Sequence, residues 1–223
     1  MARRVRHILD APGRLSPRAR AYLAAFGRRH PVWTADQHRR HWHRHGRSDA
    51  AIEHLAEYQM RWGGLELPPT REYEGGPRVL DADDLTDEEG RGSCFTAGEQ
   101  RCSMAYAFMV DGAGRFGIVG DKTWVPLHGS VAGWVEAAAL AHFAAALPAE
   151  VRLATGPRID GLPERYRLRP VREVDGVTDG WWYGDDMLLA IYRGEARFFG
   201  NPAYQTAYLY ADVDGLPERL RAG

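Results

Sequence analysis

The chain has 223 residues, 44% of them hydrophobic, and a formal net charge of −1 at pH 7. This length and composition suffice to bury a hydrophobic core, and we predict a single domain over residues 1–223. No apolar run approaches the roughly 20 residues that span a bilayer, and residues 1–6 lead into no signal-type hydrophobic segment. We therefore expect a cytoplasmic protein without a membrane partner.

Charged residues are distributed unevenly along the chain. Residues 1–47 contain 12 Arg and 2 Asp, which gives a charge of +10, whereas residues 71–99 contain 9 acidic residues and 3 Arg, which gives −6. The basic segment is compatible with nucleic acid or an acidic protein surface as its partner, but no nucleic-acid-binding motif accompanies it. We favour a solvated helical face as its interpretation. The two segments could face each other or face different partners.

The first third of the chain predicts a layer of three helices. The pair Ser16-Pro17 is typical of a helix start, with serine as the N-cap and proline at the first helical position. Thr34 and Gln37 have the spacing of a capping box, which places a second helix over residues 35–45. This second helix is almost entirely polar, so its hydrophobic contribution to a core is small.

The third helix carries the clearest pattern. Ser48 is a suitable N-cap, and apolar residues such as Leu55 recur at helical spacing up to Trp62. Gly63 fits the left-handed position just past a helix end. We expect Trp62, Gly63 and Gly64 to form a structural turn between the helical layer and a sheet, because glycines allow a reversal that side chains would block.

Residues 66–100 form a polar, acidic region after two consecutive prolines. Its carboxylates repel one another and few apolar residues compensate, so we predict a mobile surface loop with one strand near residues 78–80. Clustered carboxylates can bind a basic partner by imitating phosphate groups. The candidate partner-binding residues of this loop are Asp81, Asp83, Asp84, Asp87, Glu88 and Glu89.

Residues 101–147 predict a hairpin followed by a helix. A strand over 102–110, turn residues at 111–114 and a returning strand over 115–119 form the hairpin. A further extended piece contains Pro126, which indicates a sheet edge or a strand end. Ser130 then caps a helix that reaches about residue 147.

Residues 148–223 predict a strand-rich extension. Aromatic and branched segments at 181–183, 187–192, 196–199 and 204–211 are separated by turn residues. Most of these rings are expected in the core, but Trp181 and Trp182 could also mark a ligand groove or a partner surface. The whole chain thus predicts an α+β fold, in which a helical layer (16–65) packs on a mostly antiparallel sheet that continues into the extension.

Several segments resemble the SUKH superfamily, the fold of many bacterial toxin-immunity proteins. Residues 58–65 resemble its signature of an aromatic-rich helix that runs into Gly-Gly, and the hairpin turn at 111–114 and the helix that begins at Ser130 follow in the same order. The similar region covers roughly residues 16–147. The resemblance implies an α+β fold without catalytic residues or a cofactor, which acts by tight binding to a toxin domain.

Two departures from that family are visible. Trp62 stands where the family more often has Tyr or Asn, and the strand-rich residues 177–211 extend beyond its ordinary core. These departures leave open which surface of the chain would contact a partner.

The polar second helix offers a competing hypothesis. His38, His41 and His45 are spaced i, i+3 and i+7, so their imidazoles share one helix face and could bind Zn²⁺ or a similar metal. The His-Glu-x-x-His motif of metal hydrolases is absent from the sequence. The sequence therefore leaves two functions: a non-catalytic module that binds another protein, such as a basic toxin domain, or a metal-dependent enzyme that uses the histidines of residues 35–45.

Overall fold

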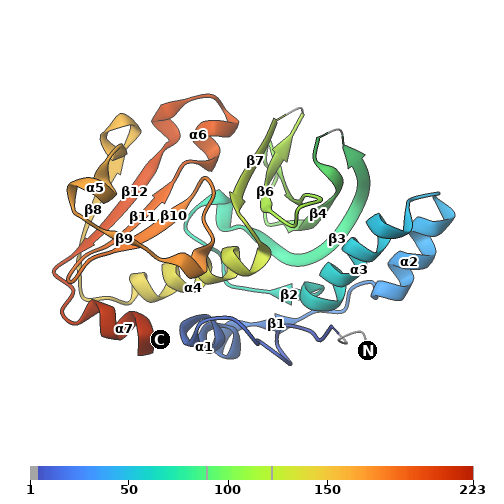
Figure 1. Cartoon of the computed structure of the whole chain (residues 1–223), viewed down its shortest axis with the longest axis horizontal. Helices are drawn as coiled ribbons and strands as arrows, with labels where there is room; N and C mark the ends of the chain where they lie inside the picture. The colour runs from blue at the N-terminus through green and yellow to red at the C-terminus, as the bar shows by residue number, and fades with distance from the viewer. Residues whose placement is uncertain (1–4, 89, 122, 223) are drawn as a thin grey trace.

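The computed structural model describes residues 5–88, 90–121 and 123–222, and its two antiparallel sheets with flanking helices confirm the predicted α+β fold class (Figure 1). The helices of the described residues are α1 (Pro17–Phe26), α2 (Ala35–Arg44), α3 (Asp49–Trp62), α4 (Val131–Ala145), α5 (Leu162–Arg165), α6 (Gly194–Phe198) and α7 (Leu216–Ala222). Short 3-10 helices are η1 (Tyr73–Gly75), η2 (Gly156–Ile159), η3 (Arg172–Val174) and η4 (Pro202–Tyr204). None of the helices in these ranges has the length and apolar character needed to cross a membrane.

The first sheet is a meander in which each strand pairs with the next one along the chain. Its order is β1-β2-β3-β4-β5-β6-β7, and every pair is antiparallel. The strands are β1 (Arg28–Arg29), β2 (Leu65–Glu66), β3 (Pro77–Glu88), β4 (Gly92–Gln100), β5 (Ala107–Val110), β6 (Phe116–Gly120) and β7 (Thr123–His128).

The second sheet is built from the predicted strand-rich extension. Its order is β8-β12-β11-β10-β9, again antiparallel throughout. The strands are β8 (Glu150–Thr155), β9 (Arg169–Pro170), β10 (Gly180–Tyr183), β11 (Leu188–Tyr192) and β12 (Thr206–Ala211).

The predicted helix starts are confirmed by their caps. The Ser16 hydroxyl accepts a hydrogen bond from the Ala19 N–H (3.1 Å) at the start of α1. Thr34 and Gln37 form the complete capping box of α2, in which each side chain bonds the other residue's backbone N–H. These interactions are local in sequence, so residue spacing alone was sufficient to predict them.

The turn after α3 differs from its prediction in one residue. Gly63 is extended (φ −55°, ψ 128°), and the left-handed residue is Gly64, with φ of +81°. The Gly63 N–H closes the last helical turn on the Gln59 carbonyl (2.9 Å), and the Gly64 N–H donates to the Leu80 carbonyl (2.7 Å). The chain thus enters the sheet one residue later than predicted, because the reversal occurs where the backbone first bonds β3.

The predicted mobile loop over residues 66–100 is wrong, since most of this region forms the paired strands β3 and β4, but the strand expected near residues 78–80 is confirmed as part of β3. Buried side chains such as Leu80 and Leu85 attach β3 to the core, while the carboxylates lie mainly on its exposed side. Register shifts on either side of Asp83 break the alternation of buried and exposed residues. Figure 1 shows β3 as a long arc beside α3.

Two further predictions for the sheets are corrected. The hairpin turn at 111–114 is confirmed, but the strand before it begins at Ala107 instead of residue 102. The segment 196–199 is helical rather than extended, because α6 is closed by bonds such as Arg197 N–H to the Arg193 carbonyl (3.0 Å). Its Phe198 ring then packs on Tyr106 at a centroid distance of 5.4 Å.

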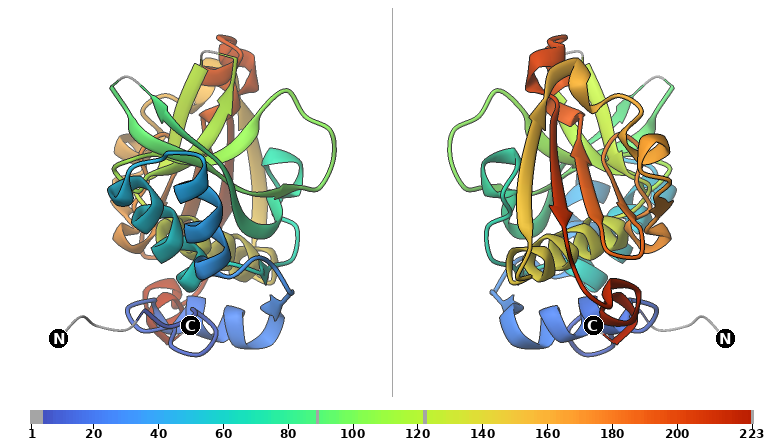
Figure 2. Two further views of the ribbon diagram at one scale, coloured as in Figure 1. Left: turned by 90° about the vertical axis from the view of Figure 1, so that its right-hand side faces the viewer. Right: turned by 90° about the vertical axis from the view of Figure 1, so that its left-hand side faces the viewer.

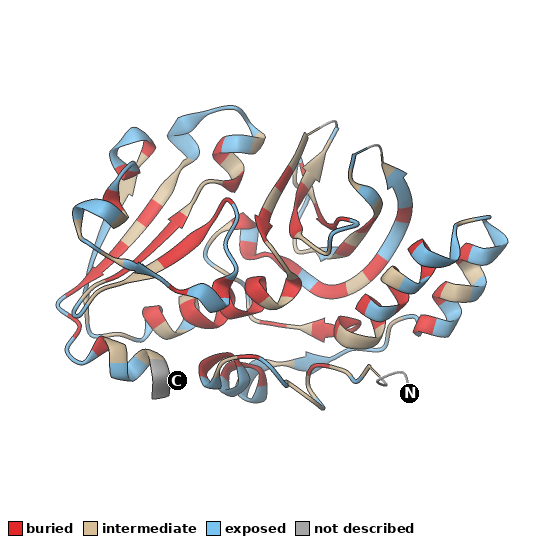
Figure 3. Cartoon of the chain, viewed as in Figure 1, coloured by how far each residue is buried: buried red, intermediate tan, exposed pale blue. Residues whose placement is uncertain are grey.

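Helix α4 joins the two halves of the molecule. Trp134 and Val135 belong to the core formed with the first sheet, whereas Leu140 and Ala144 belong to the core formed with the second sheet. Figure 1 shows α4 running beneath both sheets, and Figure 3 shows buried residues along its length. Both sheets therefore share one helix as their common support.

Candidate functional site

Trp33 is the most prominent exposed aromatic residue near the acidic strand β3. It precedes the N-cap Thr34, and 49% of it is exposed. Its ring lies 5.4 Å from the ring centroids of both His38 and His41. Trp33 and His38 occupy the two positions of a hydrophobic staple, so the start of α2 fixes the direction of the indole.

Gln59 connects the Trp33 loop to β3. This side chain on α3 is only 4% exposed, and its Nε2 donates to the Trp33 carbonyl (2.7 Å) and to Asp81 Oδ1 (2.6 Å). Its Oε1 accepts from the Ala82 N–H (2.9 Å). Because all three bonds are made by one buried amide, the backbone of Trp33 and the Asp81 carboxylate of β3 are held beside one another.

The predicted acidic residues have different environments. Asp83 and Asp84 are exposed, and no salt bridge engages either of them within the described residues. Asp81 is half-buried, and burial raises the pKa of its carboxyl, with the Gln59 hydrogen bond opposing this shift. We define the Trp33 surface as Trp33, His38, His41, Asp81, Asp83 and Asp84.

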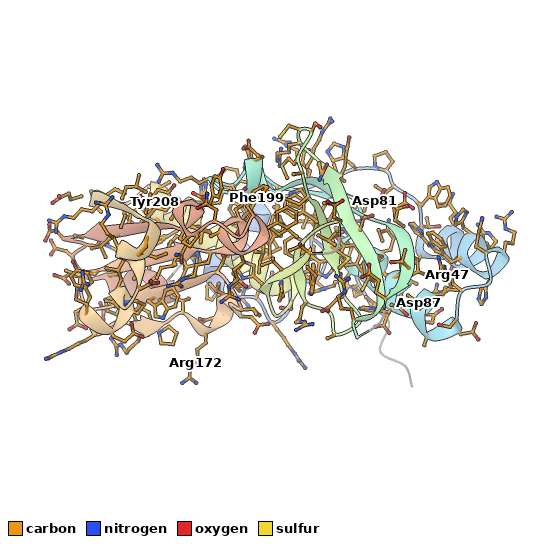
Figure 4. All side chains as sticks on the ribbon, turned by 90° about the horizontal axis from the view of Figure 1, so that it is seen from above. Arg47, Asp81, Asp87, Arg172, Phe199 and Tyr208 are labelled. Atoms are coloured by element: carbon orange, nitrogen blue, oxygen red, sulfur yellow. The ribbon has the colours of Figure 1, made fainter. Side chains whose placement is uncertain are left out.

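The other acidic candidates are engaged within the chain. Asp87 lies 3.7 Å from the Arg47 guanidinium and accepts a hydrogen bond from the Ser93 hydroxyl (2.7 Å). Glu88 forms an ion pair with Arg91, and Glu89 lies outside the described residues. Figure 4 shows Arg47 and Asp87 at the same end of the molecule as Asp81.

The basic and acidic segments of the sequence thus face each other in part. Besides the Arg47 contact with Asp87, Arg39 pairs with Asp36 and Glu53 (both 2.7 Å) within the helical layer. Nucleic acid as a partner of the basic segment stays a prediction of the sequence. The internal pairs leave fewer arginines of this segment available to bind phosphate groups.

The three histidines of the metal hypothesis do not share an environment. His38 is 3% exposed, neither of its ring nitrogens has a hydrogen-bond partner, and burial lowers the pKa of its imidazole. His41 and His45 stack at 4.3 Å, and His45 Nδ1 is 2.8 Å from the His41 carbonyl oxygen. In the part of the chain that the structure describes, no three His, Cys, Asp or Glu side chains are grouped to hold a metal ion. Zinc stays a prediction of the sequence.

The remaining candidate residues are tryptophans that pack in or against the hydrophobic core. Trp181 is 2% exposed and stacks on Tyr210 at 6.4 Å in the core beside α4, so it offers no surface to a partner. Trp182 is half-buried and packs against the apolar cluster on the other face of the second sheet. Trp62 is 8% exposed at the turn after α3, with the Arg61 guanidinium 5.6 Å from its ring.

A second polar cluster lies at the junction of the two sheets. The buried Asp179 carboxylate accepts hydrogen bonds from the Tyr73 hydroxyl, the Arg193 N–H (2.8 Å) and the Gly194 N–H (3.1 Å). Burial raises the pKa of Asp179 to about 7, although these hydrogen bonds oppose the shift. Burial also lowers the pKa of the neighbouring His128 to about 4, so its imidazole is neutral at physiological pH.

The size of the cavity beside this cluster limits what the cluster can bind. The adjoining cavity has a volume of about 20 Å³ and is lined by Tyr73, His128, Trp134 and Asp179 among others. A cavity of this size holds about one water molecule and no substrate. We therefore assign the cluster a structural role in joining η1 to the second sheet.

Sequence reasoning missed Trp33 of the candidate surface and Gln59, the buried residue that supports it. Trp33 could have been recognised because an aromatic residue directly before a capping box is a staple signal. Gln59 interrupts the apolar stripe of α3, and a polar residue in such a stripe indicates a buried hydrogen-bonding position. The contact of both with β3 depends on the tertiary fold.

Comparison with known proteins found no match: no protein-family model fits the chain, and neither a curated protein nor a solved structure is significantly similar to it.

Proposed function

We propose that this chain is a non-catalytic protein-binding module that neutralises a basic toxin domain by direct contact through the Trp33 surface. The observation that supports this most is the exposed indole of Trp33, a residue whose backbone carbonyl is bonded by the same Gln59 amide that bonds the Asp81 carboxylate of β3. Tryptophan is enriched among the residues that dominate binding energy at protein interfaces. Asp83 and Asp84 supply exposed negative charge beside it, which complements a basic partner.

The contacts of Trp33 reduce the conformational entropy that its side chain loses on binding. The Trp33 carbonyl is bonded by Gln59, and its ring is supported by His38 and His41. A side chain already held in one orientation loses little freedom when a partner covers it, and affinity rises accordingly. The resemblance of residues 16–147 to the SUKH superfamily supports the same class of function.

Neutralisation and binding of a toxin domain test this proposal. The genes beside the one for this chain are searched for a toxin domain; a domain found there is coexpressed with the chain, and the Kd of the purified pair is measured by calorimetry. We expect Trp33→Ala to weaken binding by about 30-fold or more, the effect of losing a dominant interface residue. We expect Asp83→Arg combined with Asp84→Arg to slow association and to abolish its acceleration at low salt.

A matched control separates this surface from general effects of aromatic residues. Tyr204 on η4 is 52% exposed, similar to Trp33, but lies on the second half of the chain. Tyr204→Ala should leave the Kd unchanged. Failure of the unaltered chain to bind or neutralise the toxin domain would overturn the proposed function. Full neutralisation by both Trp33 surface variants would instead assign the contact to another surface.

A further inference from the structure

The edges of the two sheets are protected to different degrees. Within the described residues, β1 is a two-residue strand of arginines, and β9 is a two-residue strand that contains Pro170. β7 contains Pro126, and its last residue, His128, is bridged to Gly176. Short length, charge and proline are the usual means of preventing an edge from pairing with another strand. The fourth edge, β8, has six residues without proline, and it pairs with β12 without a bulge.

The β8 edge also exposes apolar side chains. Val151 is 48% exposed and Leu153 is 62% exposed, and both lie on the same face of the sheet because they are two residues apart. That face adjoins a groove of about 470 Å³ between β12, the end of α4 and the loop before η1. Figure 2 (right) shows β8 as the outermost strand of its sheet.

The backbone of β8 is available for a further strand. The Gly156 N–H donates to the carbonyl of Gln205, the residue directly opposite on the β12 side (3.1 Å). In an antiparallel pair the bonded positions alternate, so the backbone groups of Val151, Leu153 and Thr155 point away from β12. The outward-facing backbone groups thus coincide with the exposed apolar residues.

We propose that β8 pairs antiparallel with β8 of a second copy of this chain, with Val151 opposite Val151 across a two-fold axis. This register places Glu150 of each copy opposite Arg152 of the other. Leu153 lies opposite Ala149, which precedes β8 and whose N–H donates to the Leu147 carbonyl (2.9 Å), so the backbone bonds centre on Val151. Within one chain, Glu150 and Arg152 pair with each other, at 2.9 and 3.0 Å, and both side chains are 57% exposed. They can therefore exchange partners without being buried.

Charge selects this register over its neighbours. Only the outward-facing backbone groups of β8 can bond the second copy. The alternative registers are therefore those in which Val151, Leu153 and Thr155 stay in bonded positions. The next register places Arg152 directly opposite Arg152, and like charges opposite each other across strands are destabilising. The register after that places Arg152 opposite Ala154, so the two copies form no ion pair with each other. An isologous dimer through Val151 is the only one of the three with paired opposite charges.

This dimer is independent of the proposed function. β8 and the helices α2 and α3 lie at opposite ends of the molecule (Figure 1), and Tyr208 of the groove lies far from Asp81 (Figure 4). The two Trp33 surfaces of a dimer would both remain accessible. A failed toxin test therefore leaves the dimer standing, and a monomeric chain leaves the proposed function standing.

The test is the mass of the full chain in solution, measured by light scattering and sedimentation over a concentration series. We expect a species of twice the 25.0 kDa chain mass. Glu150→Arg and Arg152→Glu should each weaken dimerisation at least about tenfold, because each places like charges opposite one another twice. The double variant, with both residues exchanged, should restore the dimer. A mixture of the two single variants should form a heterodimer.

A charge reversal far from β8 is the control for these variants. Glu57→Arg on α3 is an exposed charge reversal at the other end of the molecule and should leave the dimer intact. The single variants should keep the circular dichroism of the original chain, and their urea midpoint should match that of the original chain at concentrations low enough for it to be monomeric, because exposed ion pairs contribute little to stability and only dimerisation adds to it. A monomer at every concentration, or single variants that dimerise like the original chain, would overturn the proposal.

Discussion

Gly64 and Gly46 share a left-handed backbone, with φ of +81° and +70°, but differ in their surroundings. Gly64 lies in the turn from α3 into the sheet, where its N–H donates to the Leu80 carbonyl (2.7 Å) and its carbonyl accepts from the His30 N–H (2.8 Å). A Cβ atom on Gly64 would lie 2.2 Å from the His30 carbonyl oxygen, whereas a Cβ on Gly46 would meet nothing within 4 Å. Alanine causes backbone strain at both positions but a collision only at Gly64.

These differences set the expected magnitudes. A side chain in the left-handed region costs about 1 to 2 kcal/mol, which is the whole effect expected of Gly46→Ala. At Gly64 the collision must also displace β1 or the turn, which adds about 1 to 3 kcal/mol. We therefore expect Gly64→Ala to lower the free energy of unfolding by about 2 to 5 kcal/mol. For a chain of this length, the additional loss of about 1 to 3 kcal/mol at Gly64 places the Tm of Gly64→Ala roughly 2 to 12 °C below that of Gly46→Ala.

Urea unfolding followed by circular dichroism compares the two variants directly. We expect Gly64→Ala to be clearly less stable than Gly46→Ala, and Gly64→Val to be less stable than either. Equal losses of stability at the two glycines would refute the predicted collision at Gly64, since they would show that β1 does not approach the turn in solution. A stable Gly64→Ala chain that loses the proposed neutralising activity would show instead that the turn belongs to the proposed binding surface.

Three further predictions concern buried groups. Glu136→Ala leaves the buried Arg18 guanidinium (3.4 Å away) without its ion-pair partner and should cost about 3–5 kcal/mol in urea unfolding, whereas Glu53→Ala, at an exposed pair, should change little. Phe108→Ala removes a fully buried ring that packs in the core of the first sheet, and should cost about 3–5 kcal/mol in the same assay. Because the pKa of Asp179 rises from 3.8 in the unfolded chain to about 7, the folded state binds this proton more tightly and stability falls as pH rises between these values. Relative to Asp179→Asn, the original chain should lose up to roughly 4 kcal/mol between pH 4 and pH 7, and a pH-independent difference would contradict the buried carboxyl.

Local signals in the sequence were sufficient for the helical layer. Ser16, Thr34 and Ser48 cap their helices because a hydroxyl three residues before a free N–H can bond it whatever the rest of the fold does. The hairpin turn at 111–114 is similarly local, since the Asp111 carboxylate bonds the N–H groups of Ala113 and Arg115. These elements need no knowledge of the tertiary structure.

Only the start of strand β3, near residues 78–80, was predicted, because the pattern of the rest is interrupted. The register shifts on both sides of Asp83 place two exposed residues in succession, so the strict alternation that identifies a strand is absent. The repulsion between its carboxylates is offset by burial of Leu80 and Leu85 and by internal partners such as Arg47 for Asp87. A count of charges along the sequence gives no information on these partners.

The segment 196–199 was misassigned for a different reason. Its consecutive phenylalanines have high β-propensity, but α6 is closed by bonds to Arg193 and to Asn201, and its Phe198 ring reaches Tyr106 on the first sheet. Tertiary contacts between residues far apart in sequence thus override the local preference. The same holds for the candidate surface, where Gln59 of α3 bonds both Trp33 in the loop before α2 and Asp81 of β3.

The strand-rich extension is joined to the rest of the chain by its core and by its polar contacts, which leads to a last prediction. A chain ending at residue 147 would expose the face of α4 that carries Leu140 and Ala144, and would leave the buried Tyr73 hydroxyl without Asp179. An exposed apolar helix face and an unpaired buried hydroxyl both destabilise. We expect this truncated chain to aggregate or to lack a cooperative unfolding transition, measured by size-exclusion chromatography and urea titration. A soluble, cooperatively folded fragment would show that residues 16–147 form an independent unit and that the extension is an added layer.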